Sequence, residues 1–323
     1  MSSKDFLDLE QQDELLPPKV QQQLPSTSNG QHQRLALRWY LGLGFLSLLA
    51  LWFALPGLTC LGSAAYGVAY WMLKQPKVWT APLVPGAQLG NFTVPKILHQ
   101  TWKSRVIPDK WKAAQQSCQS LHPDWEYKLW TDADGLEFIE KHYPEFLPTY
   151  LAYPYNIQRA DAIRYFILYH YGGVYIDLDM GCRKPLDFMR QYNFTAPLTY
   201  PGGLSNDVMA AMPGDAYLGR VLAHLKAWNR FMVIKYIQVM FSTGPMFLTT
   251  QYSLSGNKFD VAVIPPAMYG KYDKSGDAYF YHLHGSSWHE HDAKLPAVFC
   301  IMCMKLGECT ASTFLAQPAA LSC

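Results

Sequence analysis

Charged side chains are scarce in this chain. Of its 323 residues, 27 are Lys or Arg and 25 are Asp or Glu, so only 16% carry charge, whereas about a quarter is usual in soluble domains. The formal net charge of +2 lacks the basic excess of a nucleic-acid-binding domain. Seven cysteines are too few and too scattered for a disulfide-rich scaffold. The length allows one or two domains with a sizeable core.

Charge is missing altogether from Trp39 to Leu73, a run of 35 residues. Because a membrane-spanning helix needs roughly 20 apolar residues, this run predicts a membrane segment. Pro56-Gly57 divides it, so we expect one span ending near Leu55, followed by an interfacial stretch. A hairpin of two spans is the less favoured alternative, because each half falls at the short end of the range. The run begins too late and is too long for a cleaved signal peptide, which indicates a signal anchor.

The segments around the anchor differ in composition. Residues 1–34 are polar and rich in Gln, which predicts a disordered cytosolic tail. Glycosylation sequons begin at Asn91 and Asn193, and because such sites are used only in the secretory lumen they weakly support a lumenal domain after the anchor. The expected organisation is a tail at 1–34, an anchor and interfacial segment at 35–74, a linker at 75–90, a catalytic domain at 91–295 and a C-terminal tail at 296–323.

The predicted catalytic domain alternates short apolar runs with helical patterns. Strands are expected at Pro95–His99 and Glu126–Trp130, with a helix at Lys110–Leu121 between them. Such alternation is typical of an α/β sheet.

The central motif of this domain is Asp177-Leu178-Asp179. A helix N-capped by Asn156 and ended by Gly172-Gly173 leads into the strand Val174–Ile176, which the motif follows directly. On a regular strand, carboxylates at i and i+2 face the same way, and the carboxyl end of a strand is where open α/β sheets bind ligands. Hard oxygen ligands suit Mn²⁺ or Mg²⁺ bridging a diphosphate. The pattern therefore predicts a metal–diphosphate site.

Two further groups of polar residues are candidates for this site. On the preceding helix, Ile157, Ala160, Ile163 and Ile167 recur at helical spacing, which predicts one apolar face. Asp161 and Arg164, at i and i+3, share a face displaced from the apolar one that points toward the same cleft, with a surface ion pair as the alternative. A later cluster is suited to completing a metal shell, with a polar surface loop as the alternative. Its members are His282, His284, Ser286, Ser287, Trp288, His289, His291 and Asp292.

These motifs resemble those of a known family. Four segments follow one another as in the D-x-D glycosyltransferases of family 32: Pro95–Trp102, His122–Asp132, Arg159–Tyr165 and Gly172–Asp179. Further segments are similar to one branch, the fungal inositolphosphoceramide mannosyltransferase catalytic subunits: Ser205–Met209, Ser242–Pro245, Gly285–His289 and Asp292–Lys294.

This resemblance implies a Rossmann-like GT-A fold and a metal-dependent, retaining transferase. The donor would be GDP-mannose, the cofactor Mn²⁺ or Mg²⁺, and the acceptor the membrane lipid inositol phosphoceramide. The enzyme would be a single-pass type II protein of the Golgi or ER/Golgi membrane with a lumenal catalytic domain. Family members work with a calcium-binding membrane regulatory subunit, and no nucleic acid is involved.

The resemblance also implies roles for individual residues. Asp177 and Asp179 would hold the donor diphosphate through the metal, while Asp161 and Arg164 would contact the donor sugar and ribose, and these four are the expected catalytic residues. Trp102 resembles the aromatic residue that closes on the nucleotide. The remaining implied positions are Asn206, Asp207, Gly244, Ser287 and Trp288 for the donor and His289 for the metal.

Three other functions compete with this interpretation. A phosphatase of the haloacid dehalogenase class also places D-x-D after a strand, but it expects Thr or Val where this chain has Gly181. A non-catalytic membrane subunit is disfavoured because every expected donor-site residue type is present. A family 32 mannosyltransferase acting on glycoprotein glycans is disfavoured by the Ser205 and Gly285 segments.

Overall fold

The computed structural model describes residues 43–48, 62, 92–199, 203–232, 234–255, 259–271 and 278–285. The chain divides into two compact units, Met1–Leu55 and Pro56–Cys323. Among the described residues, no helix is long and apolar enough to cross a membrane. Most of the anchor predicted at Trp39–Leu73, together with the tail at 1–34 and the linker at 75–90, lies outside the described residues and stays a prediction.

The second unit is built on a mixed six-stranded sheet in the order β2-β1-β3-β6-β5-β7. Strands β2, β1 and β3 run parallel, β6 runs antiparallel to β3 and β5, and β7 is parallel to β5. The strands are β1 (Ile97–Thr101), β2 (Glu126–Trp130), β3 (Gly173–Ile176), β5 (Phe194–Pro197), β6 (Val208–Ala211) and β7 (Val261–Ile264). A separate antiparallel pair joins β4 (Met180–Cys182) to β8 (Phe280–His282).

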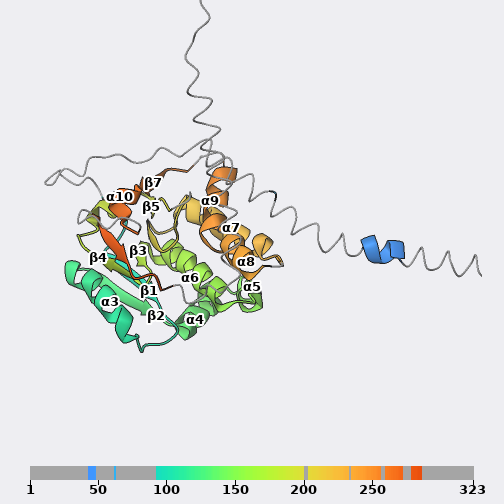
Figure 1. Ribbon diagram of the computed structural model, residues 1–323, viewed down its shortest axis with the longest axis horizontal. Helices are drawn as coiled ribbons and strands as arrows, with labels where there is room; N and C mark the ends of the chain where they lie inside the picture. The colour runs from blue at the N-terminus through green and yellow to red at the C-terminus, as the bar shows by residue number, and fades with distance from the viewer. Residues whose placement is uncertain are drawn as a thin grey trace, which may run out of the picture. The chain divides into compact units, whose positions relative to one another are not determined.

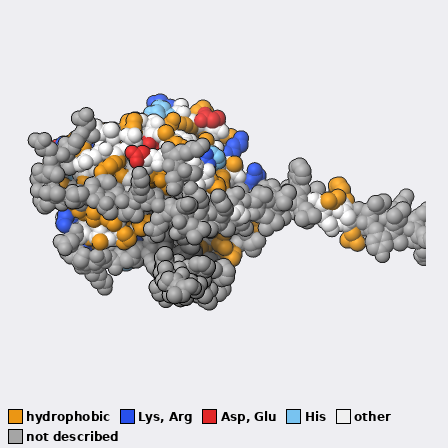
Figure 2. All heavy atoms as spheres, turned by 90° about the horizontal axis from the view of Figure 1, so that it is seen from above, with side chains coloured by type: hydrophobic (Ala, Val, Ile, Leu, Met, Phe, Trp, Pro, Cys, Tyr) orange, Lys and Arg blue, Asp and Glu red, His pale blue; other side chains and the backbone are white. Residues whose placement is uncertain are grey.

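Helices cover both faces of this sheet. The helices are α3 (Asp109–Leu121), α4 (Asp132–His142), α5 (Leu147–Ala152), α6 (Asn156–Tyr171), α7 (Ala216–Trp228), α8 (Lys235–Ser242), α9 (Pro245–Leu254), α10 (Pro266–Tyr269) and the 3-10 helix η3 (Asp187–Gln191). One hydrophobic core joins α4, α6, α7 and α9 to the sheet, and a second joins α3, β4 and β8 to it (Figure 1). The molecule is therefore the α/β fold expected from the sequence. Charged side chains are sparse among the coloured atoms of the face in Figure 2.

Helix α6 is the element that differs most from expectation. It begins at Asn156, and Tyr155 takes the N-cap position with an extended backbone, so the prediction that Asn156 caps the helix is wrong. Every residue from Asp161 to Leu168 is buried. The expected single apolar face is therefore also wrong: α6 is enclosed between the sheet and other helices, and its polar residues must find partners inside the protein.

Gly172 ends α6 as predicted, with a φ of 65°, a conformation that glycine adopts at little cost. A Cβ at Gly172 would lie 2.6 Å from Cδ of Pro213. At Gly173 a Cβ would lie 2.7 Å from the carbonyl oxygen of Ile97. The Gly-Gly pair thus lets the chain turn sharply into β3 and pack closely against β1.

A disulfide joins Cys118 on α3 to Cys182 on β4. It closes a loop over a sequence separation of 64 residues, and a bond of this kind commonly stabilises a protein by about 2 to 4 kcal/mol. Cys182 lies three residues after Asp179, so the disulfide attaches the chain immediately after the D-x-D motif to α3. Sequence reasoning missed this bond, because pairings cannot be deduced from a single sequence.

Candidate active site

The D-x-D motif forms a turn at the carboxyl end of β3. The strand stops at Ile176, and the amide of Met180 donates to the carbonyl oxygen of Asp177 at 2.9 Å. The expectation that both carboxylates share one face of a regular strand is therefore wrong. Each carboxylate has its own partners: those of Asp177 come from α6 and the sheet, and those of Asp179 come from the end of β8 and the segment after it.

Asp177 is held in place by Arg164 and Tyr175. Nη1 of Arg164 lies 3.1 Å from Oδ1 of Asp177, and the Tyr175 hydroxyl donates to the same oxygen at 2.6 Å. The Thr101 hydroxyl lies 2.8 Å from the Tyr175 hydroxyl, which joins the end of β1 to the motif. The carboxylate is thus fixed by groups from β1, β3 and α6 together.

The charge of Asp177 is poorly tolerated in this setting. Burial raises the pKa of Asp177 to about 7, although Arg164 favours its ionised form. The neighbouring carboxylates of Asp179 and Asp207 act in the same direction as burial, because like charges disfavour ionisation. A further positive charge beside the motif would relieve this repulsion.

Arg164 connects the motif to the interior of the protein. Its side chain is only 4% exposed, and Nη2 lies 3.1 Å from Oδ1 of Asp161. Nη1 also donates to the carbonyl oxygen of Asn206 at 2.8 Å, and Nε donates to that of Ala160 at 3.1 Å. Asp161 and Arg164 therefore share a face of α6 and pair with each other, but the pair is buried beside the motif, so the alternative of a surface ion pair is wrong.

Asp161 is itself surrounded by donors. The Asn206 amide donates to its Oδ1 at 3.0 Å and the Thr243 hydroxyl to its Oδ2 at 3.2 Å. The Tyr165 hydroxyl accepts from the Asn206 amide at 3.1 Å and donates to the Thr243 carbonyl at 2.7 Å. Burial raises the pKa of Asp161, and Arg164 opposes that effect. Tyr165 and Thr243 belong to segments that carry the resemblance, but sequence reasoning assigned neither a role.

Asp179 is positioned by the end of β8 and the segment that follows it. The Gly285 amide donates to its Oδ2 at 3.0 Å, and Nε2 of His282 lies 3.5 Å from the same oxygen. A Cβ at Gly285 would lie 2.6 Å from Oδ2 of Asp179 and 2.9 Å from the Trp111 ring. The structure therefore brings His282, from the predicted polar cluster, to the motif, and it gives Gly285 a role that the sequence alone did not show.

Asn206 and Asp207, predicted together, point to different partners. Asn206 lies in the Asp161 cluster, whereas Asp207 accepts from the Ser205 hydroxyl at 2.6 Å, from Lys271 at 2.8 Å and from the Tyr269 hydroxyl. Burial would raise the pKa of Asp207, but Lys271 and the two hydroxyls outweigh the effect of burial and hold the pKa at about 2. Asp207 is therefore a firmly ionised group already paired by the protein.

The other predicted donor residues contribute less to the described geometry. Trp102 packs beside Ile107, Trp111 and Leu178, and its indole Nε1 is buried without a partner in the part of the chain that the structure describes. Gly244 takes the N-cap position of α9. Ser287, Trp288 and His289 lie outside the described residues. Among the residues that the structure describes, no group of three His, Cys, Asp or Glu side chains is suited to a metal.

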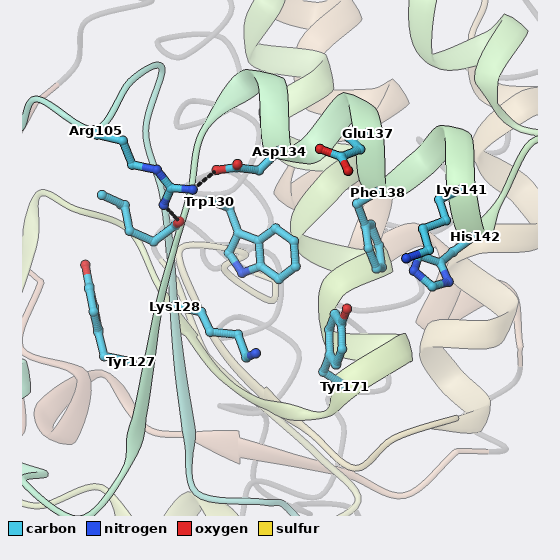
Figure 3. A pocket seen from close by; sticks show the side chains of 11 residues that line it. Arg105, Tyr127, Lys128, Trp130, Asp134, Glu137, Phe138, Lys141, His142 and Tyr171 are labelled. Atoms are coloured by element: carbon cyan, nitrogen blue, oxygen red, sulfur yellow. Dashed lines mark hydrogen bonds and ion pairs between the residues drawn. The ribbon is translucent and has the colours of Figure 1, made fainter.

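A cavity of about 410 Å³ lies away from this cluster, between β2 and α4 (Figure 3). Its walls include Trp130, Phe138 and Tyr171, and an ion pair between Arg105 and Asp134 lies at one end. None of the residues predicted for the donor site lines this cavity. The candidate site is therefore defined by the polar cluster around Asp177, not by the cavity.

Comparison with known proteins agrees with the geometry. Residues 108–195 match the family described as glycosyltransferase sugar-binding region containing DXD motif. The chain is 45% identical over 212 residues to inositol phosphoceramide mannosyltransferase 2 of Schizosaccharomyces pombe, covering 63% of this chain and 61% of the relative. It is 47% identical to mannosyltransferase 3 of the same yeast, covering 63% and 58%. With mannosyl phosphorylinositol ceramide synthase SUR1 of Saccharomyces cerevisiae the identity is 45%, covering 66% and 56%.

The chain thus spans about three fifths of the length of the curated relatives it matches. Among solved structures, the PaToxG glycosyltransferase aligns at a TM-score of 0.39 and 16% identity, covering 50% of this chain and 70% of its own. The matched residues 108–195 contain Asp161, Arg164 and the D-x-D motif. Residues 108–195 of the chain are therefore similar to the sugar-binding region of the D-x-D glycosyltransferases, and over that region and beyond it the chain resembles the inositol phosphoceramide mannosyltransferases of yeasts.

Proposed function

We propose that this protein transfers mannose from GDP-mannose to inositol phosphoceramide, with retention at the anomeric carbon, on a GT-A fold. The observation that carries the proposal is the buried cluster in which Arg164 joins Asp161 and Asp177 at the carboxyl end of β3. The names of the relatives at 43 to 47% identity support the acceptor. The resemblance to family 32 supports the donor, the fold and retention.

The residues at the motif fit a divalent cation. Two carboxylates lie on one turn, and burial and like charge raise the pKa of Asp177, a cost that a bound cation removes. Asp177 and Asp179 would hold Mn²⁺ or Mg²⁺ through oxygen, the ligand type that these ions prefer. When bound, the cation supplies Lewis-acid stabilisation of the negative charge that develops on the departing diphosphate.

The protein's own residues orient the donor. Arg164 keeps Asp177 and Asp161 in fixed positions, and a preorganised charged site stabilises developing charge without rearranging during the reaction. Asp161 and Asn206 form one hydrogen-bonded unit whose polar atoms are suited to sugar hydroxyls. Gly285 leaves room beside Asp179, so the main chain approaches the motif closely there.

We further propose that the catalytic domain is lumenal, in the Golgi or ER/Golgi, behind the predicted type II anchor. The Cys118–Cys182 disulfide supports this location, because such bonds persist in oxidising compartments. The exposed position of Asn193 at its sequon is also compatible with a lumenal domain. Association with a calcium-binding membrane regulatory subunit is proposed on the resemblance alone.

The test is transfer by the full-length chain in membranes. Membranes would be incubated with labelled GDP-mannose, Mn²⁺ and inositol phosphoceramide, and the lipid product identified by mass and by the configuration of its new glycosidic bond. We expect a mannosylated lipid in the α configuration of the donor. Chelation should abolish transfer, and Mn²⁺ or Mg²⁺ should restore it.

Variants at the motif provide the control. Asp177→Asn and Asp179→Asn should abolish transfer while the protein stays in the membrane at normal abundance, whereas Asp109→Asn, an exposed acid on α3, should leave it unchanged. Labelling of glycan acceptors alone would contradict the lipid acceptor. Full activity of either motif variant would contradict the catalytic assignment and favour a subunit without catalytic function.

A further inference from the structure

One region of the catalytic domain carries charge of a single sign. From Ala216 to Phe259 there are five Lys or Arg residues and no Asp or Glu, which leaves 22 Lys or Arg against 25 Asp or Glu in the rest of the chain. This region comprises α7, α8 and α9. The described part of this region therefore carries positive charges only, although the chain as a whole is nearly neutral.

The connection between α7 and α8 also exposes large apolar side chains. Phe231 is 80% exposed and Ile234 is 38% exposed. The cations Lys226, in the last turn of α7, and Arg230, next to Phe231 in the sequence, are also exposed. We call Lys226, Arg230, Phe231, Ile234 and Lys235 the α7–α8 patch. An exposed aromatic residue between cations is the pattern of a surface that enters the headgroup region of a membrane.

The residues on both sides of Phe231 are held by hydrogen bonds. The Arg230 amide donates to the Trp228 carbonyl at 2.8 Å, and the Met232 amide donates to Oε1 of Gln238 at 3.2 Å. The Met232 side chain is buried at 4% exposure. Since the residues on both sides of Phe231 are fixed to the helices, its ring is held outward by the fold.

The patch adjoins the elements that carry the active site. Nζ of Lys235 lies 5.6 Å from the centre of the Tyr155 ring, at the start of α6. At the other end of α8, Ser242 accepts from Gln158 of α6 at 2.7 Å, and Thr243 bonds to Asp161. With eight residues, α8 spans about 12 Å, which is the distance along the helix from the patch to the polar cluster.

We propose that the α7–α8 patch docks on an anionic bilayer surface, with Phe231 and Ile234 in the headgroup region and the cations against anionic lipids. The inference rests on the proposed function, because it takes the acceptor to be a membrane lipid. Its chemistry is consistent with that function: inositol phosphoceramide carries a negative phosphodiester, and the patch holds the active site close to the plane in which such headgroups lie.

A photo-crosslinking experiment tests the docking directly. The photoreactive residue p-benzoylphenylalanine would replace Phe231 in the full-length chain, and membranes of cells producing it would be irradiated. We expect adducts with the mass of lipid at position 231. The matched control is Leu136, which is 37% exposed on α4 among the acidic residues Asp132, Asp134 and Glu137, and it should give none. Adducts with protein only at position 231, or equal lipid adducts at both positions, would overturn the proposal.

A second measurement gives the contribution of charge. In vesicles containing anionic lipid and inositol phosphoceramide, we expect Arg230→Glu to lower transfer by about 25-fold, since each unit of charge near an anionic surface is worth about a factor of five and the reversal changes the charge by two units. The loss should disappear when the acceptor is presented in neutral detergent micelles. Lys141→Glu, which reverses an exposed charge on α4, should change transfer neither in vesicles nor in micelles.

The two measurements separate the two proposals. Absence of transfer by the unmodified chain in both vesicles and micelles would contradict the proposed function, while the crosslink at position 231 would still report docking. An equal loss for Arg230→Glu in vesicles and micelles would contradict docking, while the measured transfer would uphold the function.

Discussion

Removing the Arg164 guanidinium should be far more damaging to stability than removing an ordinary surface cation. Its side chain is 4% exposed and faces Asp161, whose side chain is 6% exposed. Taking away one partner of a buried ion pair leaves an uncompensated buried charge, which typically costs about 3 to 5 kcal/mol. We therefore expect Arg164→Met to lower the free energy of unfolding by about that amount.

The size of the expected shift in melting temperature follows from the length of the domain. For a domain of 150 to 250 residues, each kcal/mol of destabilisation lowers Tm by about 2 to 4 °C. Arg164→Met should accordingly lower Tm by about 10 °C in a thermal-unfolding assay of the purified full-length chain in detergent. Arg164→Lys should be intermediate, because an ammonium keeps the charge but lacks the planar fork that contacts Asp161 and Asp177 together.

Two further variants test whether the unpaired buried charge causes the loss of stability in Arg164→Met. Arg105→Met breaks an ion pair with Asp134 in which the Arg105 side chain is 64% exposed, and such pairs contribute about 0 to 1 kcal/mol. Adding Asp161→Asn to Arg164→Met removes the orphaned carboxylate and should recover much of the lost stability. An Arg164→Met shift no larger than that of Arg105→Met, or a double variant no more stable than the single one, would refute the reasoning.

Three more predictions concern residues elsewhere in the domain. Burial lowers the pKa of His99 to about 4, so its stabilising contribution is full above the ordinary pKa of 6.5 and is lost as pH falls from 6.5 toward 4. His99→Gln should remove about 3 kcal/mol of the fall in the free energy of unfolding over that window. Gly285→Ala places a Cβ against Asp179 and the Trp111 ring and should reduce transfer at least about tenfold, with little change in Tm, whereas an equally active variant would contradict the packing. Cys118→Ser should lower the free energy of unfolding by about 2 to 5 kcal/mol, and a reductant should reproduce that loss in the unmodified chain but not in the variant.

Local patterns in the sequence were sufficient to predict the elements that carry the site. Strand β2 has the bounds that alternation predicts, β1 begins two residues later than expected, and α6 ends at the predicted Gly172. The D-x-D motif lies at the carboxyl end of β3 as expected. These features depend on neighbours in the chain: a run of apolar residues, a glycine pair and the carboxylates that follow.

Contacts between distant parts of the chain could not be predicted in this way. Asp179 receives the amide of Gly285 from 106 residues away, and Asp161 receives the hydroxyl of Thr243 from 82 residues away. Helix α6 was expected to have one apolar face, but its burial on all sides is set by α4, α7, α8 and the sheet. One sequence contains no information on which segments close over a given helix.

The burial of α6 also explains how the site combines rigidity with charge. A polar side chain on an enclosed helix is stable only when its hydrogen bonds are met, so Asp161 and Arg164 require Asn206, Thr243 and the Asp177 carboxylate in fixed places. A cluster that is fully bonded before substrate arrives does not have to reorganise as charge develops, which is the property that electrostatic catalysis needs. The same bonds attach α8 to α6, so the proposed membrane-facing patch and the D-x-D motif are held by one continuous network. Burying Arg164 and Asp161 costs free energy, and the hydrogen bonds that compensate this cost also fix the geometry of the site before substrate binds.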